Sequence, residues 1–462
     1  MDLDTIAAIA TPQGMGGIAV IRVSGPLSET IAGLLFRPSQ PVETLKSHHL
    51  YHGDIVATEL GGAIDEGLVC LMRGPRSYTG EDVLEIYGHG GLFLPTAILA
   101  EVLKAGARPA EAGEFTRRAF LNGRLDLSQA EAVAELTGAR TGQAAQAALG
   151  RLKGDLRRMV EPFVEEMTDL LVQCEAGIDF PDEEGCDGPS AAVMADRLRF
   201  LADALERLGA TYRHGRLYRD GASVVIAGRA NVGKSSLLNC LLGQNRAIVA
   251  PLPGTTRDFI EESIDLQGIA VRLTDTAGIR ATDSDVEQAG IALVWERVEQ
   301  ADVVLLLLDG SDGLREEDRE ILEKLQGKPV LVVINKADLP QVLREQDLPF
   351  SGSGEGVRIS AKYAQGLDAL REALHRKVAG DPNAGGTASR PPLAIASLRH
   401  KLALENAAAA LHRGSDGALQ GLSPEFVAAD IQEALSALAD ISGKVTGEEI
   451  LDRVFSSFCI GK

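Results

Sequence analysis

The sequence predicts a protein of mixed α/β and α class with three kinds of domain. An α+β domain over residues 1–120 comes first, and a helical domain is formed from two chain segments, 121–215 and 381–462. An α/β domain over 216–380 is inserted between those segments. Three observations predict this arrangement: strand-like and helical patterns mix before residue 120, helical patterns flank the centre on both sides, and a glycine-rich loop lies between a strand and a helix at 228–236.

The N-terminal region combines short apolar runs with one helical stretch. Runs at 18–23 and 68–72 and the alternating run at 82–87 predict strands, and 92–103 predicts a helix. The glycines at 88–91 fit either turns or a ligand-binding loop. The region therefore predicts an α+β domain that has no phosphate-binding loop of its own.

The two helical segments are indicated by spacing and composition. A helix stripe, with alternating four- and three-residue steps, is formed by Met194, Leu198, Leu201, Leu205 and Leu208. The Ala- and Glu-rich stretch 127–149 also favours helix, as do 393–413 and 423–441. An acidic loop at 180–189 and a linker at 381–392 interrupt them. Because a domain whose termini lie close together can be inserted at a surface loop, we expect one helical domain interrupted by the α/β domain.

Composition limits the possible functions. The 462 residues carry a net charge of −20, from 46 basic and 66 acidic residues, which excludes a surface that binds polyanions generally. Five scattered cysteines without a C-x-x-C pair favour a reducing, cytoplasmic location and no zinc site built on them. The acidic start does not resemble a targeting peptide, and the aliphatic run at 303–308 is too short to span a membrane.

The stretch 228–236 has the G-x-x-x-x-G-K-S pattern of a phosphate-binding loop, between an apolar run and a helical one. Successive backbone N–H groups of such a loop, with the N-terminus of the following helix, surround a phosphate. Lys234 adds a positive charge toward the β- and γ-phosphates, and the Ser235 hydroxyl is a Mg²⁺ ligand. We therefore predict a nucleotide phosphate site here.

Four more motifs follow in the order of a Ras-like GTPase domain. Thr256, in the loop 254–258, is a second candidate Mg²⁺ ligand, and 275–278 is a D-x-x-G motif. The N-K-x-D motif at 335–338 ends in Asp338, whose carboxylate accepts hydrogen bonds and therefore suits the adjacent N–H donors of guanine. The motif at 360–362 completes the set. The predicted GTP-binding residues are Asn231, Val232, Gly233, Lys234, Ser235, Ser236, Ala250, Pro251, Leu252, Pro253, Gly254, Thr255, Thr256, Asp275, Thr276, Ala277, Gly278, Asn335, Lys336, Ala337, Asp338, Ser360, Ala361 and Lys362.

Other segments carry a family resemblance. They are Asp-Thr-Ile-Ala-Ala at 4–8, Tyr-Thr-Gly-Glu-Asp at 78–82, Gly-His-Gly-Gly at 88–91, Gly-Glu-Phe-Thr-Arg-Arg-Ala-Phe at 113–120, Leu-Asp-Leu-Ser-Gln-Ala-Glu at 125–131, Ile-Asp-Phe-Pro-Asp-Glu-Glu at 178–184 and Phe-Cys-Ile-Gly-Lys at 458–462. With the GTPase motifs, they make the chain resemble the MnmE (TrmE) family of tRNA-modification GTPases over essentially its whole length.

The resemblance implies a detailed function. The N-terminal domain would dimerise and bind a formyl- or methylene-tetrahydrofolate through Arg22, Glu81, Arg124 and Lys462, with an arginine at 124 where the family usually has lysine. A flavoprotein partner that carries FAD (MnmG, or GidA) would join it in a heterotetramer. Together they would add an aminomethyl or carboxymethylaminomethyl group to carbon five of the wobble uridine of certain tRNAs.

The hydrolytic step needs residues beyond these motifs. In signalling GTPases a glutamine after D-x-x-G orients water, but Ile279 stands here and can neither donate nor accept a hydrogen bond. The resemblance assigns that task to Glu287, with Lys234 and Asn231 also catalytic. It further implies a K⁺ ion that places positive charge between the β- and γ-phosphates, held by Asn231, Ala250, Leu252 and Thr255. Arg257 and Arg280 are alternative sources of that charge, as arginine fingers.

A ribosome-assembly or signalling GTPase, acting as a binding switch, would carry the same nucleotide motifs. Against it, the sequence shows no appended basic RNA module. The apolar ending at 453–462 predicts a tail buried against another domain, with Cys459 a buried thiol by default and a nucleophile as the alternative. A basic cluster that fits either tRNA contact or exposed helix faces comprises Arg117, Arg118, Arg124, Arg140 and residues 151–158.

Overall fold

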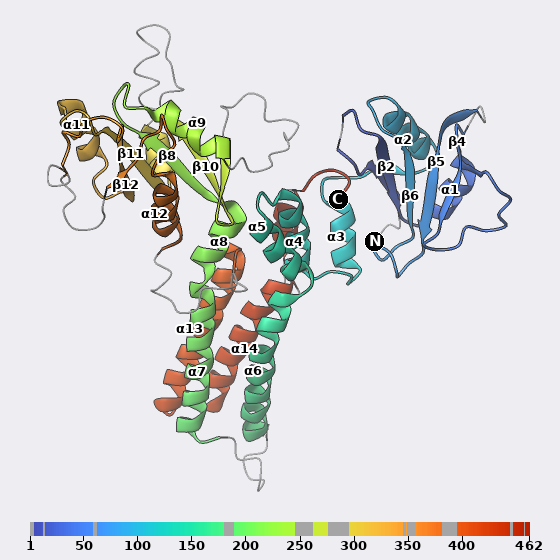
Figure 1. The fold of residues 1–462 in the computed structure, drawn as a ribbon. Coiled ribbons are helices and arrows are strands. Elements are labelled where there is room, and N and C mark those ends of the chain that lie inside the picture. Colours follow the sequence, from blue (N-terminus) through green and yellow to red (C-terminus); the bar gives the residue numbers. More distant parts are fainter. Residues whose placement is uncertain are drawn as a thin grey trace. The chain divides into compact units, whose positions relative to one another are not determined.

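The computed structural model describes residues 4–12, 14–58, 62–179, 189–244, 262–275, 295–344, 348, 356–380, 395–443, 447–456 and 458–462. The chain forms two compact units, each made of separate segments. The first unit comprises residues 1–134, 151–194 and 416–462, and the second comprises 135–150 and 195–415. The first contains the N-terminal sheet and the second contains the inserted α/β domain (Figure 1).

The N-terminal sheet has seven strands in the order β3-β4-β5-β6-β2-β1-β7, and its neighbours are antiparallel except for β1 and β7. The predicted strands at 18–23 and 68–72 fall within β2 and β5, and the one at 82–87 overlaps β6, which begins one residue later. The seven strands are β1 (Ile6–Ile9), β2 (Ile18–Ser24), β3 (Phe36–Pro38), β4 (Leu50–Val56), β5 (Ala63–Met72), β6 (Val83–His89) and β7 (Arg108–Pro109).

Helices cover this sheet on both faces. Helices α1 (Ser28–Leu35) and α2 (Leu94–Lys104) bury apolar residues against one face, including Ile31 and Ile98. Helix α3 (Glu114–Leu121) places Phe115 on the other face, where it packs with Ile6 and Ala8. The alternation of side chains along each strand allows one sheet to support both layers.

Distant segments meet in the first unit. Helices α6 (Asp155–Asp179) and α14 (Pro424–Ser442) lie side by side although the α/β domain separates them in sequence (Figure 1). Helix α15 (Glu448–Phe455) packs on α3, and Ile460 forms a β-bridge with Ala112. Phe455 and Phe458 are buried beside Leu127. The C-terminal tail thus returns to the N-terminal domain.

The inserted domain contains a six-stranded sheet in the order β13-β12-β11-β8-β10-β9, parallel except for the β9–β10 pair. The order reverses around β8, as in doubly wound α/β folds, which bind ligands at the carboxyl ends of such strands. The strands are β8 (Ala222–Ala227), β9 (Glu262–Leu266), β10 (Ile269–Asp275), β11 (Val303–Asp309), β12 (Val330–Asn335) and β13 (Val357–Arg358).

Both faces of this sheet are buried, which explains its continuous apolar strands. Along β11, Leu305 and Leu307 pack into the cluster beneath α9 (Lys234–Gln244) and α12 (Leu367–Ala379). Leu306 and Leu308 point to the opposite cluster, which α11 (Glu316–Lys324) covers. Helix α8 (Tyr212–Asp220) leads directly into β8.

The stretch 127–149 is helical, as predicted, but it is divided into two helices. It forms α4 (Leu127–Gly138) and α5 (Gly142–Leu152). Thr141 begins the second helix, because its hydroxyl accepts a hydrogen bond from the Ala144 N–H at 3.2 Å. The same hydroxyl donates to the Gly268 carbonyl, at the tip of the β9–β10 hairpin, at 2.7 Å. A local cap and a tertiary contact therefore override helical propensity.

Among the residues that the structure describes, the remaining helices are α7 (Ala191–Ala210) and α13 (Leu398–Leu419). Four members of the predicted stripe are buried in α7, namely Met194, Leu198, Leu201 and Leu205. The predicted fold class, α+β, helical and inserted Ras-like α/β, is confirmed. The linker at 381–392 and most of the acidic loop lie outside the described residues. Within the described residues, no helix is long and apolar enough to cross a membrane.

Candidate functional site

The glycine-rich loop joins β8 to α9 at the strand order reversal. Gly228 has φ +150°, and a Cβ there would lie 2.4 Å from the Leu307 carbonyl oxygen. Gly233 has φ +103°, and a Cβ there would lie 2.3 Å from Nδ2 of Asn335. Asn231 adopts φ +62°, a left-handed conformation that asparagine tolerates. The backbone conformation and the close neighbours therefore require glycine at positions 228 and 233.

Two side chains fix the loop's position. Lys234 is buried, and its Nζ donates to the carbonyls of Gly228 and Arg229 at 2.8 and 2.9 Å, so it spans the loop. Buried Asn335 donates from Nδ2 to the Val232 carbonyl at 2.8 Å and accepts from the Ala361 N–H at 2.9 Å. Asn335 thus joins the phosphate loop to the motif at 360–362. Ser235 and Ser236 are exposed at the start of α9.

The base-recognition residues are held by their neighbours. Ser360 donates to Oδ1 of Asp338 at 2.6 Å, which orients the carboxylate. Lys336 donates to Oδ2 of Asp309 at 2.6 Å. Burial raises the pKa of the Asp309 carboxyl, but hydrogen bonds from Lys336 and Ser311 outweigh it, so the pKa lies below its usual range.

Asp309 was not among the predicted site residues. It follows an aliphatic run that ends at the carboxyl edge of the sheet, and a polar residue at that place was an available signal. Ala337 donates its N–H to the Ile359 carbonyl at 2.9 Å, and Lys362 lies 5.1 Å from the Tyr363 ring centroid. The structure therefore brings the phosphate loop, 335–338 and 360–362 together.

Several predicted residues lie outside the described part of the chain. Asp275 is described only as the last backbone position of β10, paired with Ile226 of β8. The others are Ala250, Pro251, Leu252, Pro253, Gly254, Thr255, Thr256, Arg257, Thr276, Ala277, Gly278, Ile279, Arg280 and Glu287.

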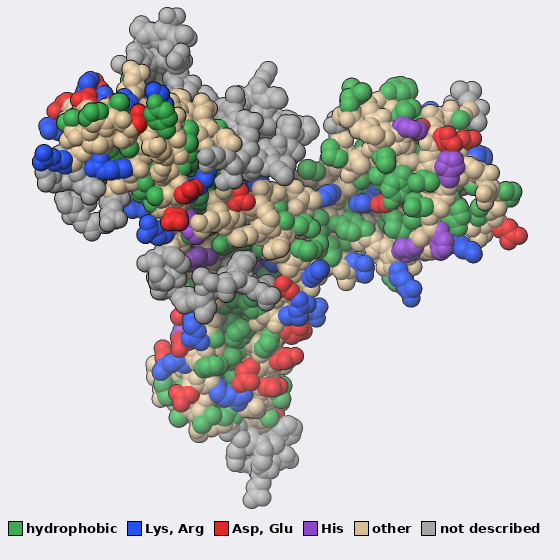
Figure 2. All heavy atoms as spheres, in the orientation of Figure 1, with side chains coloured by type: hydrophobic (Ala, Val, Ile, Leu, Met, Phe, Trp, Pro, Cys, Tyr) green, Lys and Arg blue, Asp and Glu red, His purple; other side chains and the backbone are tan. Residues whose placement is uncertain are grey.

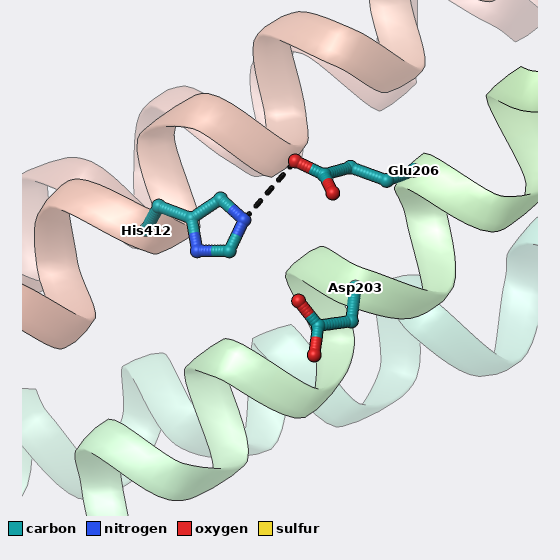
Figure 3. A group of neighbouring side chains, drawn as sticks. All are labelled: Asp203, Glu206 and His412. Carbon is teal, nitrogen blue, oxygen red and sulfur yellow. Dashed lines mark hydrogen bonds and ion pairs between the residues drawn. The ribbon is translucent and has the colours of Figure 1, made fainter.

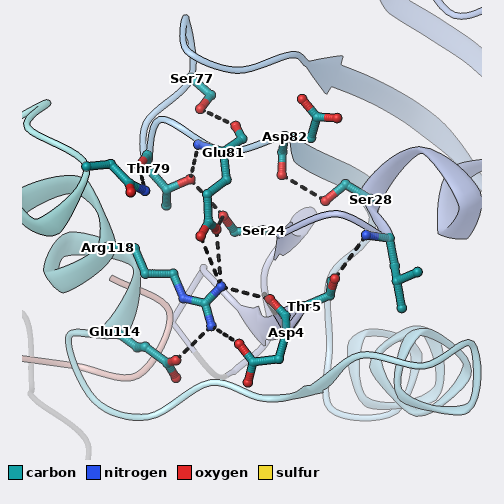
Figure 4. A network of polar contacts seen from close by, with 12 residues as sticks. Asp4, Thr5, Ser24, Ser28, Ser77, Thr79, Glu81, Asp82, Glu114 and Arg118 are labelled. Atoms are coloured by element: carbon teal, nitrogen blue, oxygen red, sulfur yellow. Dashed lines mark hydrogen bonds and ion pairs between the residues drawn. The ribbon is translucent and has the colours of Figure 1, made fainter. Parts of the chain in front are cut away.

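A second polar site lies in the N-terminal domain, centred on Arg118 (Figure 4). Its guanidinium donates to Asp4 at 2.6 Å, to Glu114 at 3.1 Å and to Glu81 at 3.2 Å. Glu81 also accepts from the hydroxyl of buried Ser24 at 2.7 Å. The predicted folate contact Glu81 is therefore held by a network that joins the start of the chain, β2, the 77–82 loop and α3.

Charge compensation in this network is visible in its pKa values. Burial alone would lower the pKa of Arg118, but the charge of Glu81 and the hydrogen bonds to Asp4 and Glu114 raise it overall. Burial would raise the pKa of Glu114, but hydrogen bonds from Arg108 and Arg118 hold it below its usual range. The paired arginines thus keep Glu114 in its acceptor form.

The other predicted folate contacts surround the same loop and β2. Arg22 pairs with Glu85 at 2.9 Å, lies 5.3 Å from the Tyr78 ring centroid and contacts the Gly461 carbonyl at 3.5 Å. Burial lowers the pKa of Lys462, Cys459 acts in the opposite direction, and the nearby charge of Arg22 lowers it further. The tail therefore brings a second cation close to Arg22.

Arg124 is exposed, and its Nε donates to the Ser77 carbonyl at 3.1 Å, in the loop that carries Glu81. Among the other arginines of the basic cluster, the Arg118 side chain is 12% exposed and Arg151 is buried. Cys459 is exposed, so the prediction of a buried thiol was wrong. Its neighbours Phe458 and Gly461 are buried instead.

The chain is similar to known proteins along its whole length. A family model described as the MnmE helical domain matches residues 127–459, and one described as the GTP-binding protein TrmE N-terminus matches 5–124. A protein of Syntrophus aciditrophicus named tRNA modification GTPase MnmE is 50% identical over 464 residues, with 99% of each chain covered. One of the same name from Heliobacterium modesticaldum is 46% identical, again with 99% of each chain covered. A solved Era variant from Aquifex aeolicus, bound to GDP and an aluminium fluoride, is 30% identical over 40% of this chain and 66% of its own, with a TM-score of 0.27.

The geometry at Asp338 predicts a change of base preference in Asp338→Asn. Ser360 would still donate to the side-chain oxygen, which leaves the new amide NH₂ facing the base. That NH₂ can donate to the C2 carbonyl of xanthine but not to the C2 amine of guanine. Losing a charge-assisted hydrogen bond costs about 1.5–3 kcal/mol, so GDP affinity should fall roughly tenfold to a hundredfold while XDP affinity rises.

Displacement of a fluorescent nucleotide by GDP and by XDP measures both affinities. Asp368→Asn is the matched control, because the Asp368 carboxylate is 95% exposed on α12 and should not affect either ligand. An unchanged ratio of GDP to XDP affinity in Asp338→Asn would contradict the assignment of Asp338 to the base.

Proposed function

The chain belongs to the MnmE (TrmE) family, and from that premise we propose that it is a K⁺- and Mg²⁺-dependent GTP hydrolase that acts in tRNA modification. With a flavoprotein partner (MnmG, or GidA), it adds an aminomethyl or carboxymethylaminomethyl group to carbon five of the wobble uridine of certain tRNAs. The observation that carries the proposal is identity of 50% over 99% of both chains with a relative named tRNA modification GTPase MnmE.

The nucleotide site supports the GTPase part. The loop geometry at Gly228 and Gly233 fits close approach of a phosphate to the backbone, and Lys234 lies across that loop. Asp338 is oriented as an acceptor by Ser360 at 2.6 Å, which suits guanine. Ser235 and Thr256 are the proposed Mg²⁺ ligands.

The N-terminal site supports binding of a one-carbon tetrahydrofolate. Arg22 and Lys462 are two cations whose mutual repulsion an anionic ligand would relieve. Glu81 is a fixed acceptor for ring N–H donors, since Ser24 and Arg118 hold it. Arg124 lies beside the same loop, and its guanidinium takes the place of the family's usual lysine.

Exposed apolar surface supports a homodimer. The loop before β2 and the turn before α2 lie beside each other, joined by a hydrogen bond from Gly90 to Gly17 at 3.3 Å. Met15, Leu92 and Phe93 there are 93%, 74% and 77% exposed, and a hollow of about 130 Å³ lies between the loops. Hydrophobic side chains gather over this domain in the face seen in Figure 2. Contiguous apolar surface of this kind is typical of an interface.

The hydrolytic step is proposed to use K⁺ bound by Asn231, Ala250, Leu252 and Thr255, with Glu287 orienting water. The left-handed backbone of Asn231 places an exposed amide side chain at the tip of the phosphate loop. A monovalent cation between the β- and γ-phosphates can supply the charge that an arginine finger supplies elsewhere. Arg257 and Arg280 remain the alternative source.

Folate binding should depend on the tail. Removing residues 460–462 takes away Lys462 and the Gly461 carbonyl that Arg22 contacts, so binding of 5-formyltetrahydrofolate should be abolished in calorimetry. Arg22→Gln should weaken it at least tenfold. Cys459→Ser should retain most binding because the exposed thiol is not needed for charge or shape. Arg37→Gln, on edge strand β3, is the control; normal binding by the truncated protein would refute the tail's role.

Potassium dependence separates the two sources of charge. If K⁺ acts, GTPase activity should fall on the order of a hundredfold when Na⁺ replaces K⁺. Asn231→Ala and Asn231→Gly should both lose the K⁺ response, and the glycine variant excludes backbone strain as the cause. Activity that ignores the cation and collapses in Arg257→Ala or Arg280→Ala would instead identify an arginine finger.

Mass spectrometry of tRNA nucleosides tests the whole proposal. Cells lacking the gene should lose the carbon-five adduct of wobble uridines, and the wild-type gene should restore it while Lys234→Ala should not. Unchanged nucleosides would reject the proposal. Accumulation of ribosomal precursors with normal wobble uridines would identify a ribosome-assembly switch instead.

A further inference from the structure

Helices α7 and α13 pack against each other, although they lie on either side of the inserted domain in sequence. Within the second unit, the hydroxyl of buried Ser415 on α13 donates to the Ala195 carbonyl on α7 at 2.9 Å. Further along, a Cβ at Gly209 would lie 3.9 Å from Leu404. Both helices present buried leucines, so packing and a buried hydrogen bond hold their spacing.

Three potential metal ligands lie on this pair. Asp203 and Glu206 are three residues apart on one face of α7, and half-buried His412 comes from α13. Their ligand atoms all lie within 4.8 Å of one another, and His412 Nε2 is 3.1 Å from Oε1 of Glu206. Figure 3 shows the two carboxylates and the imidazole turned toward one space between the helices.

The charges of this group are not balanced. Two carboxylates of like charge at this spacing on one helix repel each other. Glu206 contacts His412, whereas within the described residues the Asp203 carboxylate has no hydrogen-bond or ion-pair partner. A divalent cation would neutralise both carboxylates and use the imidazole lone pair.

We propose that Asp203, Glu206 and His412 bind one divalent transition-metal ion of the Zn²⁺ class and thereby clamp α7 to α13. Zinc takes carboxylate oxygen and imidazole nitrogen at about 2.0–2.2 Å, which spaces tetrahedral ligands by about 3.4 Å. Small changes in side-chain rotamers would bring the three ligand atoms from their present separations, all within 4.8 Å, to that spacing. Imidazole selects against Mg²⁺ and Ca²⁺, which prefer oxygen ligands.

The clamp would act on the segments that enter and leave the inserted domain. Helix α7 continues through α8 into β8, and α13 is the first helix after that domain. A metal bridge would couple the two segments without touching the nucleotide site. The site is therefore independent of the proposed GTPase and folate residues.

The test uses the full-length protein, stripped with chelator and kept in GDP and Mg²⁺. Zn²⁺ is titrated against a chromophoric chelator, and Co²⁺ absorption reports the coordination sphere. Wild type should bind one Zn²⁺ more than Asp203→Asn, Glu206→Gln or His412→Gln, with affinity at this site at least tenfold weaker in each variant. Zn²⁺ should also raise the Tm of wild type more than that of the variants.

His214→Gln is the matched control, since His214 is exposed on α8, and it should bind Zn²⁺ as wild type does. Zinc held elsewhere, for example by Cys459, is common to all proteins and cancels in the difference. Circular dichroism verifies that each variant folds. If His412→Gln does not fold, the comparison of wild type with the isosteric Asp203→Asn decides the test. Equal Zn²⁺ binding by wild type and Asp203→Asn, or a Zn²⁺-induced Tm shift of the same size in both, would overturn the proposal.

Discussion

The ion pairs of the Arg118 guanidinium hold together the polar network of the N-terminal domain. The guanidinium is 12% exposed and joins carboxylates from three separate segments, at Asp4, Glu81 and Glu114. Removing one of these partners is expected to destabilise the domain, because part of the charge on the buried guanidinium is left uncompensated. The position of Glu81, and with it the proposed ligand site, follows from an interaction that does not itself touch a ligand.

The nucleotide site is organised in a comparable way, by a neutral side chain. Asn335 uses both ends of its amide, donating to the Val232 carbonyl and accepting from the Ala361 N–H. It belongs to the base-recognition motif, yet its contacts define the phosphate loop. Each site is therefore built by one buried polar residue that links segments far apart in sequence, and such residues are expensive to leave unsatisfied.

The sequence alone predicted the elements that have strong local patterns. The strands around β2, β5 and β6, the α7 stripe and the phosphate loop follow from spacing and glycine geometry. What failed depended on tertiary contacts. Arg118 was grouped with possible tRNA-binding residues because two of its acidic partners, Asp4 and Glu81, are distant in sequence. The break before α5 coincides with the contact of Thr141 with Gly268. Cys459 is exposed next to Ile460, which forms a β-bridge with Ala112, and such a tertiary contact cannot be read from the local sequence.

The return of the tail to α3 also sets an order of events during synthesis. Translation proceeds at about 5–20 residues per second, so α15 follows α3 after a delay on the order of tens of seconds. All strands of the inserted sheet, from β8 to β13, are synthesised before then. The apolar side chains of Leu127 and Phe120, in contrast, lack the cover of Phe455 until α15 has been made. A copy that stops early leaves this apolar surface uncovered. Chaperones and proteases can recognise such exposed apolar surface.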